Sequence, residues 1–535
     1  MKNKIKGRCT TPTGTSSSGN SMFLYGFVLS FMALGIFNIM HHEMWRDELE
    51  AWMMARDAPT IGELFNNIRY QGHPALWFLS LYVLARITPD PLIMQCFHLA
   101  LAVGVVYVVL RYAPFTKLQR VLFIFGYYPF YEYCVISRNY SYGLLLLLIC
   151  LSMFRNKNGT RNYIGLSIVL FLLCQSNPYG AVIAIALALL LIFDFIFLRG
   201  DSAPISTQSK WKFSAGILIF ICGLLISAMQ MRPPRDSVWF HPTFIYDDKL
   251  LMLTKLLEAV GFIWRAYIPV PPFNQHFWGH NFISYFFDNP VNAVKATVFL
   301  SIVLGGLSLM LFLRRRAALF YYFTGTLGIT LFSYAIYGGS IRHWGHYFIV
   351  FVAAVWISNL YEEKPFKFSP LNKITIFFEG ERTAFFTFVL FVNVVAGVAA
   401  NTLDYLYPFS SNKEAATYIK TNGLDKMPIL GDQDFSASGV AAYLNRPVYY
   451  PATGRHATFI RWDNKRRAFD GSTIIKEAEL YSSHEKQDIL LVLNYQITPA
   501  AFTPYNIQPI AAFTGSVLYA ERFYLYIMKY VPRRL

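Results

Sequence analysis

The sequence is poor in charge and lacks the cysteine patterns of small stapled or metal-bound domains. Only 15% of its 535 residues are charged, whereas a soluble globular domain usually carries about a quarter. The six cysteines are scattered, form no CxxC pair and stop at Cys222. Neither a structural zinc site nor a disulfide framework is therefore predicted. No repeat of fixed period is visible, which argues against solenoid and propeller folds.

Long apolar runs are abundant instead. Hydrophobic residues make up 55% and aromatic residues 17% of the chain, and many runs approach the roughly 20 residues that cross a bilayer as a helix. The sequence predicts a polytopic α-helical membrane protein with about 11–13 transmembrane helices, of which we favour about eleven full spans. Segment 74–88 is short and begins with a proline, so we expect it to be re-entrant or interfacial.

The formal charge of +16 does not indicate nucleic-acid binding. The basic residues fall in short clusters between apolar runs, such as Arg314–Arg316, which is typical of cytoplasmic loops. This pattern places a basic, disordered N-terminus (1–21) in the cytoplasm. Loops 41–73 and 232–290 and the tail then lie on the other side. The second loop is rich in proline and aromatic residues, which fits either an interfacial belt or a lid and acceptor platform.

Three parts follow from these patterns: residues 1–21, a transmembrane region 22–400 and a polar tail 401–535. In the tail, "SSNKEAATYIKTNG" predicts a helix that ends at Gly423. The next segment, "MPILGDQDFSASGVAAYL", predicts a strand, a turn and a helix, and "DILLVLNY" and "SVLYAERFYLYIMKYV" predict strands. We expect a soluble α/β domain outside the membrane. Asp432 and Asp434 are interpreted as turn residues.

The loop 41–73 contains the stretch "HHEMWRDELEAWMMARDAP". Its spacing predicts two short amphipathic helices lying on the membrane surface, with Trp52 and Met53 toward the lipid. The second helix carries a capping box, with Thr60 at the N-cap and Glu63 three residues later.

Two adjacent carboxylates, Asp47 and Glu48, stand at the start of this loop. One interpretation makes Asp47 the N-cap of the first helix, with Glu48 favoured in its first turn by the helix dipole. A cap, however, does not require a second carboxylate, an adjacent arginine and two histidines just upstream. We therefore favour a chemical role for the pair.

Cationic and histidine side chains recur at the same expected membrane level. They are His73, Arg138, Arg265, His276, His280, Arg342, His343 and His346. A single arginine at such a level is usually an anchor at the headgroups. Several of them beside two carboxylates indicate an anion site, suited to a lipid phosphate, next to a base.

These features together resemble the GT-C class of membrane glycosyltransferases, and within it the protein O-mannosyltransferase and aminoarabinose-transferase branch. The motifs that carry the resemblance are the acidic pair after the first membrane helix, "HPALWF", "SRNYSYGLLLLL", "IRHWGHYF" and the soluble tail. The resemblance implies a sugar donor on a polyprenyl or dolichyl phosphate and a catalytic acid in the first outside loop. Asp47 matches its first acidic position and Glu48 its second.

The resemblance also implies roles for residues that hold the donor phosphate. Arg138 with Tyr140 matches an Arg-x-Tyr motif, His73 stands where relatives often have a basic residue before proline, and Arg342 matches a late arginine near the phosphate. The "QSNPYG" segment departs from the family pattern, where a Lys or His more often precedes the tyrosine. Asn177 and Tyr179 therefore receive no assigned role.

The residues suit this chemistry on their own. Glycosyl transfer from a lipid phosphate needs a base for the acceptor hydroxyl, which Asp47 can supply. It also needs cations for the departing phosphate, for which Arg138, Arg265 and Arg342 are candidates. A single displacement would invert the anomeric configuration. A divalent metal (Mg or Mn) is left open, with Asp47, Glu48 and a histidine such as His73 or His276 as ligands.

Three functional hypotheses remain at this stage. The first is a glycosyltransferase at the non-cytoplasmic face of a membrane, the bacterial inner membrane in preference to the endoplasmic reticulum. The second is a non-enzymatic carrier that flips a lipid-linked saccharide, and the third is a membrane-anchored sensor or assembly factor. Many carriers consist of two duplicated halves. No such duplication is visible in this sequence, so we favour the enzyme. Its partners would be a polyprenyl-phosphate-linked sugar, membrane lipid, and a glycan, lipid or protein acceptor.

Overall fold

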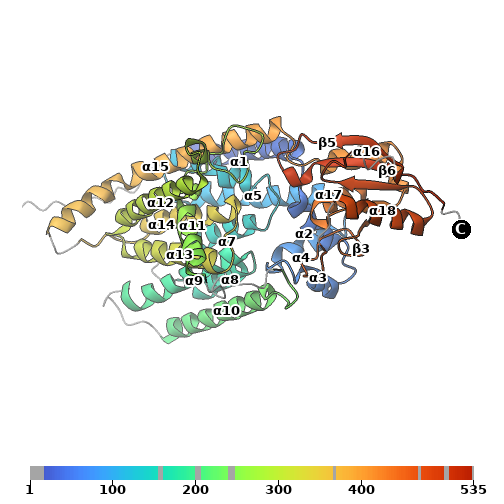
Figure 1. Cartoon of the computed structure of the whole chain (residues 1–535). Coiled ribbons are helices and arrows are strands. Elements are labelled where there is room, and N and C mark those ends of the chain that lie inside the picture. Colours follow the sequence, from blue (N-terminus) through green and yellow to red (C-terminus); the bar gives the residue numbers. More distant parts are fainter. Residues whose placement is uncertain are drawn as a thin grey trace, which may run out of the picture.

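A computed structural model describes residues 17–154, 161–198, 207–238, 248–365, 369–467, 471–498 and 505–532. Most of the predicted N-terminal segment 1–21 lies outside these residues, and its last five residues already belong to the first helix. A helical region occupies one end of the molecule and a domain built on a sheet occupies the other (Figure 1). The fold predicted from the sequence, a helical membrane protein with an α/β tail, is confirmed.

Six helical segments of the described chain are long and apolar enough to cross a bilayer, judged by length and composition. Their outward faces expose large apolar side chains, such as Phe299 at 66% and Met229 at 77%. A soluble protein would bury such surfaces, whereas lipid accepts them. The helices that contain these six segments are α1 (Ser17–His41), α5 (Leu92–Tyr112), α9 (Pro178–Phe193), α10 (Thr207–Met231), α12 (Pro290–Phe312) and α15 (Ser369–Leu406).

The remaining helices of this region are shorter or less apolar. Segment 74–88 forms only α4 (Leu76–Leu84), nine residues long, which is too short to cross a bilayer. This agrees with a re-entrant or interfacial segment. The other helices are α6 (Lys117–Ile124), a π-helical turn η1 (Tyr128–Glu132), α7 (Tyr140–Met153), α8 (Tyr163–Cys174), α13 (Arg316–Ala335) and α14 (Ile341–Ser358).

The predicted loop 232–290 requires a correction. Its middle forms α11 (Lys249–Tyr267), a helix of 19 residues. Leu250 and Leu253 on this helix are exposed, while Phe262 and Ile263 are buried in the main helical core. Charged residues within the helix and the proline and aromatic content at both ends of the segment concealed it in the sequence.

Two helices of segment 41–73, α2 (Arg46–Arg56) and α3 (Ile61–Ile68), lie between the helical region and the tail (Figure 1). The predicted orientation of α2 toward lipid is wrong: Trp52 and Met53 are fully buried in a cluster that includes α4 and Ala442 of the tail. α3 begins as predicted, since the Thr60 hydroxyl accepts a hydrogen bond from the Glu63 N–H at 3.2 Å.

The tail forms a six-stranded sheet in the order β3-β2-β1-β4-β6-β5, where β1 is parallel to β2 and β4 and the other pairs are antiparallel. Its predicted elements are present, and Gly423 ends the first helix with φ +67°. The strands are β1 (Ile429–Gly431), β2 (Val448–Tyr450), β3 (Arg455–Ala457), β4 (Ile489–Leu493), β5 (Ile507–Phe513) and β6 (Phe523–Met528).

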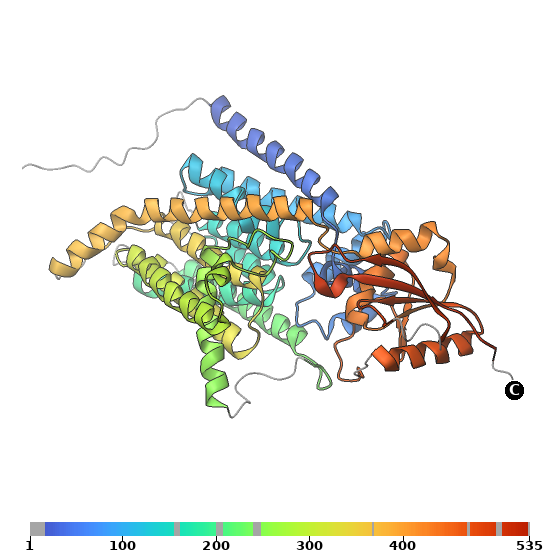
Figure 2. The same cartoon turned by 45° about the horizontal axis from the view of Figure 1, so that its top comes forward.

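Three helices cover the two faces of this sheet. The helices are α16 (Asn412–Thr421), α17 (Asp434–Leu444) and α18 (Gly471–Glu485). α16 and α17 share one apolar core with one face, and α18 shares a second core with the other face. Alternate strand residues enter opposite cores, as Leu490 and Leu491 do, which is the two-residue period of a strand. Helix α15 runs along the helical region and leads directly into this domain (Figure 2).

Candidate active site

Asp47 does not cap α2. The helix begins at Arg46, and the residue at the N-cap position is Trp45, whose backbone N–H donates to the Glu48 carboxylate at 3.2 Å. Asp47 therefore stands inside the first turn, and the N-cap interpretation of this residue is wrong. Its side chain instead contacts two guanidinium groups, and its main-chain oxygen contacts a third.

These cations surround Asp47 on several sides. Arg342 Nη2 lies 2.6 Å from Asp47 Oδ2, and Arg46 Nε donates to Oδ1 at 3.1 Å. Arg138 Nη1 donates to the Asp47 main-chain oxygen. Burial by itself raises the pKa of the Asp47 carboxyl, but Arg46, Arg342 and Arg138 outweigh burial and hold this pKa well below its usual range. Asp47 is thus a carboxylate in a strongly positive environment.

The two distant arginines have more donors than Asp47 can use. Arg342 Nε and Nη1 and Arg138 Nε are buried without a hydrogen-bond partner among the described residues. The Arg342 guanidinium also lies over the rings of Trp45 and Trp278, 5.1 and 5.6 Å from their centres. Buried donors without partners cost free energy, and a phosphate offers oxygens that guanidinium groups bind in pairs. This corner of the structure can hold an anion.

Tyr140 and His73 belong to the same region. The Tyr140 hydroxyl is 2.7 Å from His343 Nε2, and the His73 ring lies edge-on to Tyr140 with ring centres 6.3 Å apart. Burial, Arg138 and Arg342 lower the pKa of His73 to about 3, so His73 is neutral at physiological pH. Tyr179, which the sequence left without a role, stacks on His346 with ring centres 4.8 Å apart.

Three of the residues singled out in the sequence have their described contacts elsewhere. Glu48 is fully buried and accepts hydrogen bonds from His42 Nε2 at 3.0 Å and from the Ser137 N–H at 2.6 Å. Arg265 lies over Trp344, 5.0 Å from the ring centre. His276 stacks on Tyr519 of the tail and pairs with the Val517 carbonyl at 2.9 Å.

A metal ion does not fit the donor set expected for it. Both oxygens of Asp47 already face guanidinium groups, Glu48 is occupied by His42 and Ser137, and His276 contacts the tail. Within the described ranges, no three His, Cys, Asp or Glu side chains converge to hold an ion. We therefore derive no chemical step through a metal.

Glu50 is a second carboxylate of this site that the sequence reasoning missed. It lies three residues after Asp47 on α2, and its Oε1 accepts from Gln71 Nε2 at 2.8 Å and from Trp462 Nε1 of the tail at 3.2 Å. Burial, together with the negative charge of Asp47, raises the pKa of Glu50 to about 7. The i, i+3 spacing in "DELE" could have revealed it, because such residues share one helix face.

The tail also contacts the helix that carries Asp47. The Arg46 N–H donates to Glu521 Oε1 at 3.0 Å, and Arg46 Nη1 donates to the Phe435 carbonyl at 2.9 Å. Glu521 accepts a further hydrogen bond from Asn412 Nδ2 at 2.7 Å. Arg46 therefore links Asp47 to the α/β domain, and the site lies at the junction of the two parts.

The fold and the site define a polytopic helical membrane protein with an ionic centre where the helical region meets an α/β domain. No family model and no curated protein sequence matches the chain. Among solved structures, it is similar to ArnT from Cupriavidus metallidurans bound to undecaprenyl phosphate, with TM-score 0.48 and 11% identity over 96% of this chain and 98% of that chain. ArnT in the apo state gives TM-score 0.39 and 12% identity over 94% and 98%.

A third similar structure is the arabinofuranosyltransferase AftD from Mycobacteria, with TM-score 0.34 and 9% identity, over 95% of this chain and 40% of that chain. The two ArnT structures are matched over nearly their whole length, whereas AftD is matched over less than half of its own. The residue roles proposed below are based on the contacts of this chain alone.

Proposed function

We propose that the protein transfers a sugar from a polyprenyl-phosphate or dolichyl-phosphate donor to an acceptor. The reaction takes place at the non-cytoplasmic face of a membrane, which we take to be the bacterial inner membrane. One observation supports this most strongly: Arg138 and Arg342 carry buried guanidinium nitrogens without partners among the described residues, directly beside Asp47. This arrangement combines a phosphate site with a base.

The chemistry requires one bond to form and one to break. The acceptor oxygen attacks the anomeric carbon, the bond from that carbon to the phosphate oxygen breaks, and the acceptor proton passes to a carboxylate. The phosphate leaves with its negative charge, which Arg138 and Arg342 stabilise through the N–H groups that have no partner in the resting site. Because the displacement is single, the anomeric configuration is inverted.

The ion pairs of Asp47 regulate its basicity. In the resting site Arg342 and Arg46 hold the Asp47 carboxylate, and a carboxylate with a lowered pKa is a weak base. A donor phosphate brings negative charge to the same guanidinium groups, so it competes with Asp47 for Arg342. Donor binding therefore raises the pKa of Asp47 and prepares it to accept the acceptor proton.

The first test measures donor turnover. Purified protein in detergent is incubated with a panel of labelled polyprenyl-phosphate sugars, and release of polyprenyl phosphate is measured for the wild type and for Asp47→Asn. We expect turnover of one donor by the wild type and a loss of at least about 100-fold in the variant, with donor binding retained. The matched control is Asp488→Asn, which removes a tail carboxylate paired with Lys529 and should keep full turnover.

The other outcomes are equally informative. Equal turnover by wild type and Asp47→Asn would refute Asp47 as the base. Binding of a donor by both proteins without turnover would refute the enzyme and favour a carrier of lipid-linked saccharides. Identical anomeric configuration in donor and product would refute the single displacement.

A further inference from the structure

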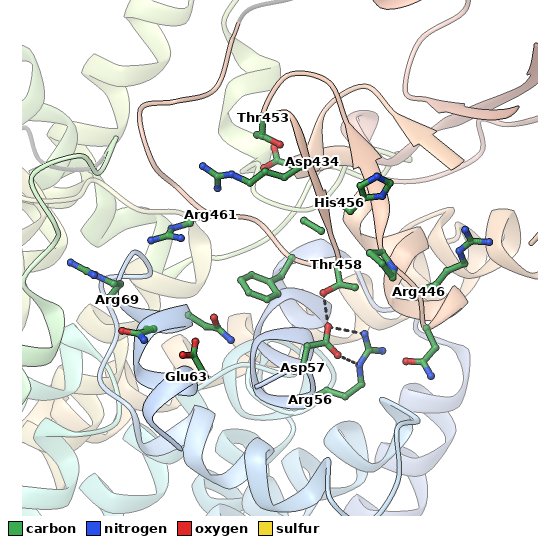
Figure 3. A pocket seen from close by; sticks show the side chains of 17 residues that line it. Arg56, Asp57, Glu63, Arg69, Asp434, Arg446, Thr453, His456, Thr458 and Arg461 are labelled. Atoms are coloured by element: carbon green, nitrogen blue, oxygen red, sulfur yellow. Dashed lines mark hydrogen bonds and ion pairs between the residues drawn. The ribbon is translucent and has the colours of Figure 1, made fainter. Parts of the chain in front are cut away.

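A second polar cavity lies apart from Asp47, between the first outside loop and the tail (Figure 3). It has a volume of about 650 Å³ and is lined by α2, α3 and the segment of the tail around β3. Ligand sites in proteins typically measure about 300–1,000 Å³, so the cavity has room for a few sugar rings. The cavity has no part in the chemical step at Asp47.

Arginine dominates the lining of this cavity. Five arginines face three acidic residues, and the arginines are Arg56, Arg69, Arg446, Arg455 and Arg461. Two of the acids are already neutralised. Arg56 binds Asp57 with two hydrogen bonds of 2.6 and 3.0 Å, and Arg466 binds Asp434 with bonds of 2.9 and 2.8 Å. Arg455 is itself paired with Asp463 at 2.9 Å. Arg69, Arg446 and Arg461 remain against Glu63, so the rest of the lining is positive.

Two of these arginines, Arg69 and Arg461, contact the ring of Tyr70. The guanidinium of Arg69 lies 5.6 Å and that of Arg461 lies 4.8 Å from the ring centre of Tyr70. Arg461 also donates to the Tyr70 hydroxyl at 3.3 Å, yet its side chain stays 49% exposed and its nearest ion-pair partner, Asp463, is 3.8 Å away. The Tyr70 hydroxyl donates to the Asp236 carboxylate at 3.1 Å, so one negative charge already lies near Arg461. The exposed guanidinium of Arg461 can still bind a further anion.

The cavity is connected to Asp47 through one helix. Arg56 is the last residue of α2 and Asp47 is the second, so they are about 14 Å apart along the axis at 1.5 Å per residue. Trp462 follows Arg461 and donates to Glu50, which lies one turn from Asp47. The cavity and Asp47 therefore lie at opposite ends of the same helix.

We propose that this cavity binds the anionic part of the acceptor, a saccharide that carries phosphate or carboxylate groups. Arg69 and Arg461 bind the anionic group through their paired N–H donors, for which guanidinium is better suited than ammonium. The acceptor role rests on the proposed function, whereas anion binding can be measured without it. Phe459, an aromatic side chain in the lining, offers a flat surface for a sugar ring.

The test compares charged and neutral trisaccharides. Binding of trigalacturonate, of a maltotriose phosphate and of maltotriose to purified full-length protein in detergent is measured by calorimetry at low and at physiological salt. We expect the two anionic sugars to bind and maltotriose not to bind comparably. Arg69→Gln/Arg461→Gln should weaken anionic binding by at least about tenfold, because each lost charged hydrogen bond is worth roughly that factor. Arg111→Gln, which removes an exposed arginine of α5, should change nothing.

A separate competition distinguishes this cavity from the donor site. Saturating polyprenyl phosphate should leave trigalacturonate binding unchanged, and full displacement would mean that the sugar occupies the site of Arg138 and Arg342. The proposal is overturned if no anionic sugar binds, if maltotriose binds as tightly, or if the double variant binds like the wild type. Binding without turnover of any donor would overturn the proposed function and the acceptor role while anion binding stands.

Discussion

At the residue scale, Asp47 is the group whose behaviour depends most on what else is bound. Its negative charge balances Arg342 and Arg46 in the resting site, and these cations keep its pKa well below the usual range against the effect of burial. The same property that stabilises the resting site makes Asp47 a weak base. A phosphate bound to Arg342 raises the pKa of Asp47 and makes it a stronger base.

The pH dependence of turnover tests this coupling. A base must be deprotonated, so activity falls as the pH drops through its pKa. The profile of kcat/KM reports the free protein and that of kcat reports the donor complex. We expect the acidic limb of kcat to lie at higher pH than that of kcat/KM, because the bound phosphate raises the pKa of Asp47. Coincident limbs would show that the donor does not weaken the Asp47–Arg342 ion pair.

Glu50 adds a second titration close to neutrality. Its pKa is raised to about 7, first by burial and then by Asp47, so Glu50 gains its negative charge as the pH rises through about 7. That charge raises the basicity of Asp47, and we expect kcat to increase over the same interval. Glu50→Gln should remove this increase and keep activity within about tenfold of the low-pH value of the wild type.

The pH profile of the Glu50→Gln variant distinguishes an effect of the Glu50 charge from a purely structural role of its side chain. A variant that loses activity equally at every pH would show that Glu50 only holds Gln71 and Trp462. Glu479→Gln, an exposed carboxylate of α18, is the control and should reproduce the wild-type profile.

The sequence identified some residues of this site and not others for a physical reason. Asp47, Arg138 and Arg342 come together as the resemblance implied. Glu48 could not be separated from Asp47 by sequence, because its partners His42 and Ser137 are set by the packing of three segments. Arg265 carries the same charge as Arg342, but its place over Trp344 depends on the path of α11.

At the scale of single elements, α2 shows what a periodic pattern can and cannot predict. The spacing correctly indicated one apolar face with Trp52 and Met53. It did not indicate the partner, and we assigned lipid where the structure has α4 and α17. Lipid and a protein core are equally apolar. The local sequence therefore predicts an apolar helix face but does not predict which of the two covers it.

The end of α1 is connected to α2 and α15 through one buried histidine. His42 lies between Glu48, at 3.0 Å from Nε2, and Asp404, at 2.8 Å from Nδ1. Burial lowers the pKa of His42, but Asp404 and Glu48 outweigh burial and raise this pKa well above 6.5. The imidazole is therefore protonated in the folded protein at neutral pH, and it binds two carboxylates that would otherwise repel each other.

Stability should consequently fall in alkali. The folded state holds the His42 proton more tightly than the unfolded state, so the stabilisation is complete below the unfolded pKa of about 6.5 and is lost as the pH rises through the higher folded pKa. At pH about 6, His42→Gln should lower the free energy of unfolding by roughly 3–5 kcal/mol, and the variant should unfold at a lower temperature. Its stability should not decline further as the pH rises. Thermal unfolding in detergent between about pH 6 and 9 measures both effects.

The neighbouring histidine provides the control for this experiment. His41 is exposed and pairs only with the Phe37 carbonyl among its described hydrogen-bond partners. His41→Gln should keep the wild-type dependence on pH. A wild type whose stability does not change in this interval would contradict a charged His42.

At the scale of the whole molecule, the class and the order of the parts could be read from composition, whereas the path through the membrane could not. Hydropathy indicated about eleven spans, but several apolar segments form helices as short as α4 and α8, with nine and 12 residues. α11 was hidden because charged Lys255 and Glu258 interrupt its apolar run. A helix packed inside a bundle can be short or partly polar, since its neighbours cover what lipid would not.

The tail domain is part of the site rather than an appendage, and Glu521 tests this. Its carboxylate joins the Arg46 N–H at the start of α2 to the Asn412 side chain at the start of α16. Glu521→Ala leaves both donors without their partner, which costs about 1–3 kcal/mol. We expect faster hydrogen exchange in α2 and α16, by roughly 5- to 150-fold, and a fall in donor turnover, because Arg46 holds Asp47.

A graded comparison makes this prediction specific. Glu521→Gln keeps one acceptor oxygen and should lie between wild type and Glu521→Ala in both exchange and turnover. Glu477→Ala removes a carboxylate of α18, a helix far from Arg46 in the sequence, and should alter neither quantity.

If exchange in α2 is unchanged while turnover falls, Glu521 acts on the reaction without fixing α2. If hydrogen exchange rises while turnover is unchanged, the tail stabilises α2, but donor turnover does not depend on that stabilisation. Only the joint change shows that the α/β domain sets the position of Asp47, and through it the geometry of the ionic centre.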